Sequence, residues 1–321
     1  MGTWAGWPGG AERRGPRQQR HPGHWTEADA WRRPFPAEGV GVVSSVQRLA
    51  GDRLHLSHGP IDVVLRAWGT PDAVRAAESA AIAVFPGILP GLAAELAELR
   101  RPMAEAPQVA HPIARRMVAA CAPFAPVFLT PMAAVAGAVA DALLAAMLRA
   151  APLDRAYVNN GGDIAVRVAA GQSIAIGLAD DPLRLALQGA LLITGDSGIG
   201  GVATSGRHGR SFSLGIADAV TVLARDAAMA DAAATLIANA VDCDSPAVRR
   251  ATAVSRDPDS DLGEHLVTVD VGTLSATEVA QALDAGLARA EAFRAAGHII
   301  GAAMRLGGAL RTTGLPALPA P

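Results

Sequence analysis

The side chains that could do chemistry in this chain gather in residues 200–242. This stretch opens on a glycine-flanked polar loop, continues through a β-branched run at 220–223 and ends in an alanine-rich segment. Glycine lets a backbone approach a ligand closely, and successive N–H groups in such turns form concavities that bind anions. We interpret the stretch as the centre of a ligand site.

The alanine-rich segment carries Asp231, Thr235 and Asn239 four residues apart. On a helix these positions share one face, with roughly 5–6 Å between successive Cβ atoms. A carboxylate and a hydroxyl on adjacent turns suit Mg²⁺, which takes one or two protein oxygens and completes its shell with water and phosphate. The same spacing is typical of a helix with a solvated polar edge, and Asn239 is equally suited to bind backbone. Periodicity alone does not separate these interpretations.

The polar loop supplies two guanidinium groups, Arg207 and Arg210, among small residues that begin with Thr204, Ser205 and Gly206. Planar guanidinium groups bind phosphate through paired hydrogen bonds. We therefore predict that this loop contacts a phosphate group of the ligand.

A second glycine-rich turn, Asn-Asn-Gly-Gly-Asp at 159–163, lies between two predicted strands. Asn and Gly accept positive φ, so this sequence favours a tight hairpin turn. The turn explains the glycines, whereas Asp163 opens a strand and is expected to have a partner. A turn alone and a turn that also belongs to a site both fit the pattern.

One motif is rejected. Gly-Asp-Ser-Gly at 195–198 is similar to the nucleophile segment of trypsin-like proteases, but no matching histidine segment, secretory signal or disulfide set accompanies it. No Gly-Lys-Ser/Thr follows these glycines either, which excludes a Walker phosphate loop.

Composition narrows the function classes. The chain has 321 residues, with 28 Lys and Arg against 30 Asp and Glu, so its net charge predicts neither a nucleic-acid nor a membrane partner. Cys121 and Cys243 lack metal-ligand or redox spacing, which favours reduced thiols. Residues 1–38 are rich in Gly, Pro and Arg and contain no secretory signal; we predict a disordered leader and a cytoplasmic protein. Asp141, within the apolar segment 131–151, indicates a packed helix instead of a membrane span.

Strand and helix patterns are mixed without strict alternation, which predicts an α+β fold with a largely antiparallel sheet in a single domain, residues 39–321. Predicted strands are 53–58, 61–67, 156–159, 163–168, 173–178, 190–194, 202–204, 220–223, 266–271 and 298–306. Predicted helices are one from Thr70 that ends before Pro86, then 93–101, 111–121, 130–150, 226–241 and one from a capping box at Ser275 to Gly297.

Four motifs together resemble an uncharacterised bacterial and archaeal protein family related to ApbE, the FAD:protein FMN transferase, and often labelled thiamine-biosynthesis-like. They are TPMAAVAGAVAD at 130–141, YVNNGGDI at 157–164, ATSGRHGRSFSLGIAD at 203–218 and ADAAATLIANAVD at 230–242. With weaker segments, the resemblance covers nearly all the chain beyond the leader. It implies an ApbE-like, T-fold-related arrangement of mixed sheet and helices.

The flavin transferases cleave FAD and, with Mg²⁺, attach FMN to a threonine of a target protein. Their Gly-Gly-Asp turn, Ser-Gly loop and Ala-Asp-x-x-x-Thr metal helix resemble 161–163, 205–206 and 230–235 here. The resemblance implies that Asp231 and Thr235 bind the metal. The residues that would contact the flavin nucleotide are Asn160, Gly161, Gly162, Thr204, Ser205, Gly206, Arg207 and Arg210.

The chain departs from the transferases at two places. Ala136 stands where they have a lysine, and the segment 209–217 lacks their His-Ile-Ile-Asp-Pro motif. We therefore predict a Mg²⁺-dependent enzyme that acts on a flavin nucleotide, FAD or FMN, or a related phosphorylated small molecule, with Asp163 and Asp218 as candidate bases. The alternative is a non-catalytic flavin-binding, metabolite-binding or accessory protein of the same fold. A homodimer is compatible with the sequence, which does not set the oligomeric state.

Overall fold

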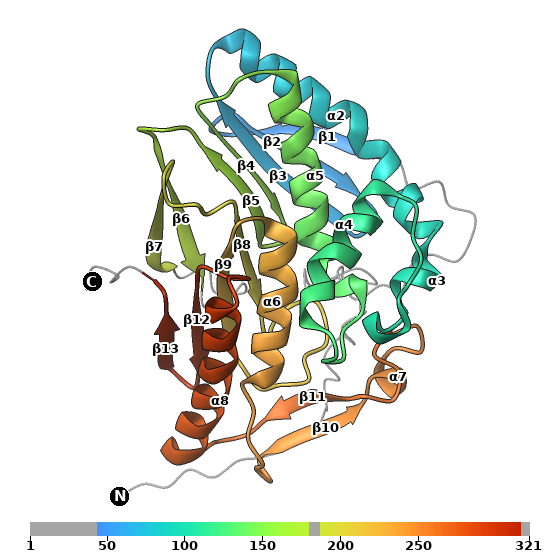
Figure 1. The fold of residues 1–321 in the computed structure, drawn as a ribbon, viewed down its shortest axis with the longest axis vertical. Helices are drawn as coiled ribbons and strands as arrows, with labels where there is room; N and C mark the ends of the chain where they lie inside the picture. The colour runs from blue at the N-terminus through green and yellow to red at the C-terminus, as the bar shows by residue number, and fades with distance from the viewer. Residues whose placement is uncertain (1–43, 180–186, 316–321) are drawn as a thin grey trace, which may run out of the picture. The chain divides into compact units, whose positions relative to one another are not determined.

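A nine-stranded sheet organises the residues that this computed structural model describes, 44–179 and 187–315 (Figure 1). The strand order is β1-β2-β3-β4-β5-β8-β9-β12-β13, and every neighbouring pair is antiparallel. The strands are β1 Ser45–Leu49, β2 Arg53–His58, β3 Ile61–Trp68, β4 Arg155–Asn160, β5 Asp163–Val168, β8 Gly201–Ser205, β9 Ala219–Ala224, β12 Gly301–Leu306 and β13 Ala309–Thr313. The predicted α+β class with a largely antiparallel sheet is confirmed, whereas the predicted leader lies outside the described residues.

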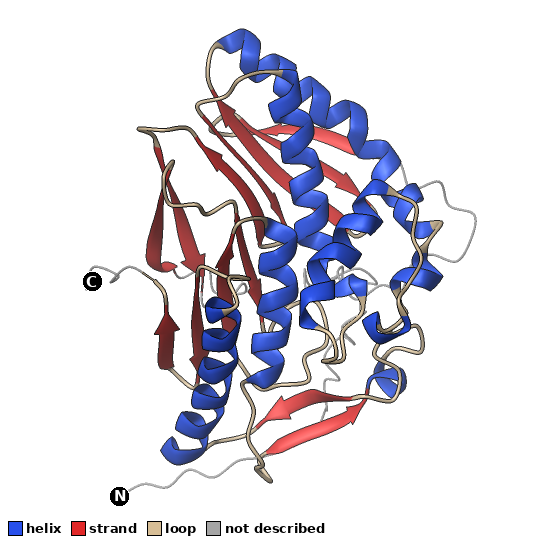
Figure 2. Ribbon diagram, in the orientation of Figure 1, coloured by secondary structure: helices blue, strands red, loops and turns tan. Residues whose placement is uncertain are grey.

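Helices cover one face of this sheet (Figure 2). Of these, α2 Pro71–Ala93, α5 Val135–Ala150, α6 Ala227–Ala240 and α8 Ala276–Ala295 contact the sheet strands. The other described helices are α3 Leu96–Leu99, α4 Pro112–Cys121 and α7 Ala253–Arg256, with 3₁₀ turns at Met103–Glu105, Ala122–Phe124 and Pro131–Ala134. Every second residue of β3 is buried, which gives the sheet an apolar inner face. Leu65 of β3, Phe85 of α2 and Met147 of α5 belong to the main core between the helices and the sheet.

A hairpin of β6 (Ser173–Ala179) and β7 (Leu187–Thr194) packs against the large sheet, and the two form a second, smaller core. Its buried members are Val166, Val168, Ile174, Ile176, Leu191, Ile193, Val202 and Leu223. A further two-stranded sheet pairs β10 (Val248–Thr252) with β11 (Leu266–Val271). The Thr268 N–H of β11 donates to the Ser213 carbonyl at 2.8 Å, so this hairpin supports the loop that precedes β9.

The prediction that the helix starting from Thr70 ends before Pro86 is wrong, because α2 continues through Pro86 and Pro90 to Ala93. Both prolines are exposed, so water can solvate the carbonyls that lose a helical donor. Ile88 and Leu92 lie on the buried face and keep the last turns packed on the core. Tertiary packing overrides the local signal here.

Two helices are long and apolar enough to span a membrane by length and composition alone, Pro71–Ala93 and Pro131–Ala150. The core helices of soluble proteins pass the same test, and 61% of the apolar window of the second helix is buried in this fold. For the first helix the buried share is 33%. Packing against the sheet accounts for the apolar character of the buried faces.

A carboxylate from each of the helices α5 and α6 accepts hydrogen bonds from N–H groups at the start of the other helix. The two carboxylate oxygens of Asp141 in α5 accept hydrogen bonds from the N–H groups of Ala227 and Ala228, at 3.1 and 3.0 Å, where α6 begins. In return, Oδ2 of Asp231 in α6 accepts from the Gly137 N–H of α5 at 3.0 Å. First-turn N–H groups have no partner within their own helix and carry partial positive charge. Each helix therefore caps the other.

The exchange requires close contact at Gly137. A Cβ at this position would lie 2.2 Å from the Ala227 carbonyl oxygen and 2.8 Å from the Ala228 nitrogen. No side chain fits there unless the two helix starts move apart, so glycine is needed where α5 meets α6.

We expect Gly137→Ala to destabilise the fold by about 2 kcal/mol or more, because the methyl group overpacks a buried helix contact and strains the carboxylate caps. Gly87→Ala in α2 is the matched control, since its Cβ would meet no atom within 4 Å. That change should raise the free energy of unfolding by about 0.4–1 kcal/mol. Urea denaturation followed by circular dichroism measures both. Equal stability of the two variants would contradict the packing argument.

Candidate functional site

The candidate site begins at the turn between β4 and β5. Gly161 and Gly162 have φ values of +67° and +114°, and the Gly162 N–H donates to Oδ1 of Asn159 at 2.8 Å. Asn160 and Asp163 face each other as the last cross-strand pair. The predicted hairpin turn is confirmed, and it places Asp163 at the first position of β5.

Two hydrogen bonds connect this turn to the elements around it. Oδ1 of Asp163 accepts from the Thr204 N–H of β8 at 3.2 Å. Nδ2 of Asn160 donates to the Ala136 carbonyl at the start of α5 at 3.1 Å. The Thr204 hydroxyl lies 2.9 Å from the Thr221 hydroxyl of β9. The turn is thereby held against both β8 and the capped N-terminus of α5.

Asp163 and Asp231 form a pair of interacting carboxylates. Burial raises the pKa of Asp231 well above its ordinary value, and the charge of Asp163 raises it further. The N–H groups of Gly137 and Ala136 act in the opposite direction. Burial also raises the pKa of Asp163 to about 7, opposed by the Thr204 N–H and by the charge of Arg210. Two neighbouring half-buried acids in mutual repulsion are typical of sites that bind cations or transfer protons.

Arg210 brings positive charge to the same turn. A Cβ on Gly161 would lie 2.9 Å from Nη1 of Arg210, so the guanidinium rests against the glycine backbone. Its charge also lowers the pKa of Asp163. The structure therefore joins Asn160, Gly161, Asp163, Thr204, Arg210 and Asp231 in one place.

The polar face predicted for α6 is present. Asp231, Thr235 and Asn239 are half-buried, whereas Ala232, Ala233, Ala234, Leu236, Ile237 and Ala238 between them are buried. Oδ1 of Asn239 accepts from the Leu214 N–H at 3.0 Å, so this residue serves the backbone. The Thr235 hydroxyl makes no hydrogen bond within residues 44–179 and 187–315, which leaves it available to a ligand.

The oxygen-bearing side chains of this region are of the kind that Mg²⁺ prefers. Asp231, Thr235 and Asp163 supply hard donors, and a carboxylate that accepts one N–H bond retains further lone pairs. Within the described residues no group of three or more His, Cys, Asp and Glu side chains is suited to a metal. A cation held here would therefore complete its shell with water and ligand phosphate, as Mg²⁺ does.

Asp218 and Arg207 form a separate cluster. Oδ1 of Asp218 accepts from Nε and Nη2 of Arg207 at 2.9 and 2.6 Å, and Oδ2 accepts from the Gly307 N–H at 2.7 Å. Nε2 of His208 lies 3.4 Å from the same Oδ1. Gly206, which follows Ser205 at the end of β8, lies against this cluster, because its Cβ would be 2.5 Å from the Asp218 carbonyl oxygen. No hydrogen bond or ion pair among the described residues links Asp218 to Asp163 or Asp231.

Sequence reasoning missed Asp141 and Gly137 as parts of this site. Nε of Arg116 donates to Oδ2 of Asp141 at 2.9 Å, and burial raises the pKa of Asp141 against the effect of Arg116 and two N–H groups. The available signal was a single aspartate within an alanine helix, since a buried carboxylate needs partners. Those partners lie at the start of α6, and the sequence around Asp141 does not predict them.

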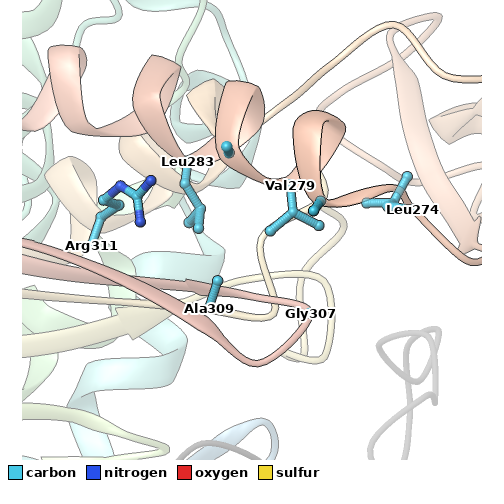
Figure 3. Close-up of a pocket in the computed structure, with 8 residues that line it drawn as sticks. Leu274, Val279, Leu283, Gly307, Ala309 and Arg311 are labelled. Atoms are coloured by element: carbon cyan, nitrogen blue, oxygen red, sulfur yellow. The ribbon is translucent and has the colours of Figure 1, made fainter.

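A cavity of about 460 Å³ lies elsewhere, between α8 and the β12–β13 hairpin (Figure 3). Its lining is mostly apolar, with Leu274, Val279 and Leu283 on one side and Ala309 on the other. Arg311 is the one charged residue in that lining, and Asp284 already pairs with it at 3.1 Å. This cavity offers no catalytic groups.

Comparison with known proteins places the chain in a family. The sequence model described as "AbpE bacteria" matches residues 46–312. The chain belongs to this family. Similar curated proteins include a UPF0280 protein of Methanopyrus kandleri, 42% identical over 161 residues, which are 49% of this chain and 61% of the relative. A UPF0280 protein of Methanothrix thermoacetophila is 42% identical over 150 residues, 46% of this chain and 60% of the relative.

The matches to these two curated relatives thus span about 60% of the relatives' own length, and other UPF0280 relatives are matched over about half of theirs. Among solved structures, the apo form of the flavinyl transferase ApbE from Pseudomonas stutzeri covers 85% of this chain and 93% of its own, with 14% identity and a TM-score of 0.35. The predicted membership in an ApbE-related family is confirmed by the family model and the UPF0280 relatives.

Without metal, the carboxylate pair should make stability depend on pH. Both folded-state pKa values lie above the unfolded ones, so the stability these groups contribute is present at low pH and is lost as pH rises through about 7. Thermal unfolding in EDTA should therefore show a lower Tm at pH 8 than at pH 5.5. Asp163→Asn, which cannot ionise, should lose less over this interval.

Asp284→Asn on α8 is the control for this experiment, because that carboxylate is exposed and pairs with Arg311 away from the turn. It should follow the wild-type dependence on pH. Parallel curves for Asp163→Asn and the wild type would show that the two acids do not interact as described.

Proposed function

We propose that this protein is a Mg²⁺-dependent enzyme that breaks a phosphate linkage in a flavin nucleotide such as FAD, or in a related phosphorylated small molecule. The observation that supports this most directly is the pairing of Asp163 with Asp231 beside Arg210 at a glycine turn. Two half-buried acids beside a guanidinium suit a ligand that arrives as an anion with its cation. Family membership agrees with this proposal.

Asp231 and Thr235 are the proposed ligands of the cation, with Asp163 next to them. A bound Mg²⁺ would neutralise charge that develops on phosphate oxygens. Arg210 would pair with a phosphate oxygen, because a guanidinium forms strong charged hydrogen bonds with phosphate. Gly161 carries no side chain that would separate Arg210 from the turn, so a phosphate bound by the guanidinium would lie next to the turn.

Asp163 is the proposed general base. From the end of the hairpin turn it would take the proton of the acceptor hydroxyl or water that attacks phosphorus. With FAD as substrate, the oxygen of the acceptor bonds to the phosphorus of the FMN half. The bond between the two phosphates breaks, and AMP leaves.

Asp218 and Arg207 are the weaker candidates for base and phosphate ligand. Their mutual ion pair and the bond from Gly307 give both a role in attaching the loop to the β12–β13 hairpin. We therefore assign the proton transfer to Asp163 and the phosphate contact to Arg210. A catalytic role of the other pair stays a prediction.

FAD incubated with the purified protein, with and without Mg²⁺, tests the proposal by chromatography of released AMP. We expect release only with the metal, reduced about 100-fold or more in Asp231→Asn and about tenfold in Thr235→Ala. Asn retains an acceptor for the Gly137 N–H, so Asp231→Asn should still fold, and circular dichroism checks this. Asp284→Asn is the matched acidic control and should release AMP at the wild-type rate.

Other outcomes decide between classes of function. Retention of FAD or FMN without turnover, measured by flavin absorbance after gel filtration, would favour a non-catalytic flavin-binding protein of the same fold. The substitution of Ala136 for the transferase lysine is the observation that favours this second candidate. The proposed site would be overturned if the protein neither released AMP nor retained a flavin, and if Asp231→Asn bound Mn²⁺ as the wild type does.

A further inference from the structure

A second cavity, about 340 Å³ in volume, lies between α5, the end of β5 and the loop at residues 194–200. Its apolar lining comprises Leu144, Ala145, Leu148, Val166, Val168 and Ile199. Its charged lining comprises Arg116, Asp141, Arg167, Arg225 and Asp226. The volume is within the range of small-molecule sites, roughly 300–1,000 Å³, which combine apolar walls with a few charged groups.

The acids of this cavity are already satisfied. Asp141 accepts from Arg116 at 2.9 Å and from two N–H groups at the start of α6. Oδ1 of Asp226 accepts from the Met229 N–H at 2.9 Å and caps the same helix. The helix terminus therefore has no need of an external anion, and neither acid needs a further cation.

The two other guanidinium groups differ in this respect. The guanidinium groups of Arg167 and Arg225 make no hydrogen bond or ion pair within residues 44–179 and 187–315, although both residues line the same cavity. Gly200 holds the neighbouring loop against Arg225, since a Cβ on Gly200 would lie 2.1 Å from the Arg225 carbonyl oxygen. Arg167 in β5 and Arg225, which directly follows β9, are both exposed, so a ligand in the cavity can reach the two charges.

We propose that this cavity binds a small amphipathic organic anion. The acidic group of the ligand would pair with Arg167 and Arg225, and its apolar body would pack on Leu144 and Leu148 of α5 and on Ile199. Guanidinium groups favour carboxylate, sulfonate and phosphate oxygens, and the apolar lining favours a hydrocarbon or aromatic body. None of Asp163, Arg210, Asp231 and Thr235 lines this cavity, so the inference does not depend on the proposed enzyme activity.

Titration with 8-anilino-1-naphthalenesulfonate, an aromatic sulfonate whose fluorescence rises in apolar surroundings, tests the proposal on the full chain. We expect saturable binding to the wild type and a Kd raised about tenfold or more in Arg167→Ala/Arg225→Ala, because both charged contacts are lost. Ala145→Phe should weaken binding similarly without a change of charge, since the ring occupies the cavity. Thermal melts establish that each variant is folded.

Arg311→Ala is the matched control, because Arg311 lines the other cavity, beside α8, and its removal leaves Arg167 and Arg225 in place. Its Kd for the probe should equal that of the wild type. Three results would overturn the inference. In the first, the wild type shows no saturable binding of the probe, and in the second, the Kd stays unchanged both in the double variant and in Ala145→Phe. The third such result is a loss of binding that is confined to Arg311→Ala.

Discussion

The exchange of carboxylates between α5 and α6 is the interaction on which the candidate site depends. Each helix start presents N–H groups that lack partners, and each obtains an acceptor from the other helix, Asp141 in one direction and Asp231 in the other. Because the donors and acceptors belong to the same two helices, neither can shift without a loss of caps on both. The contact needs Gly137, and it places the Ala136 carbonyl where Asn160 of the β4–β5 turn binds it. A capping interaction thus aligns a helix pair with a glycine turn.

The same interaction creates an electrostatic cost. Asp231 caps α5 from within an apolar helix, and Asp163 lies near enough to raise its pKa further. A fold that needed only a cap at this position would be served by a neutral acceptor, such as the side chain of serine or asparagine. The second acid at the turn makes no contribution to that cap; its bond to the Thr204 N–H compensates only part of its desolvation. Destabilising arrangements of this kind are concentrated at functional sites.

Local sequence patterns predicted the parts of this site that are local. The Asn-Asn-Gly-Gly-Asp turn, the capping box at Ser275 and the half-buried face of α6 follow from short-range geometry, and the structure has all three. The partner of Asp141 could not be predicted, because the N–H groups it binds lie 86 and 87 residues away along the chain. The continuation of α2 through Pro86 and the ion pair of Asp218 with Arg207 likewise depend on tertiary contacts, which propensity and spacing do not report.

Position 136 shows how the site's charge is arranged in this chain. Resemblance to the flavin transferases places a lysine there, yet Ala136 contributes only backbone, with its carbonyl bound by Asn160. The positive charge at the turn comes instead from Arg210, on the loop that Asn239 and the β10–β11 hairpin hold through Leu214 and Ser213. With both acids ionised, one guanidinium leaves the turn net negative, which disfavours a phosphate by itself. A divalent cation would reverse that sign. Cation and phosphate are therefore expected to bind cooperatively, each supplying the charge that the other requires.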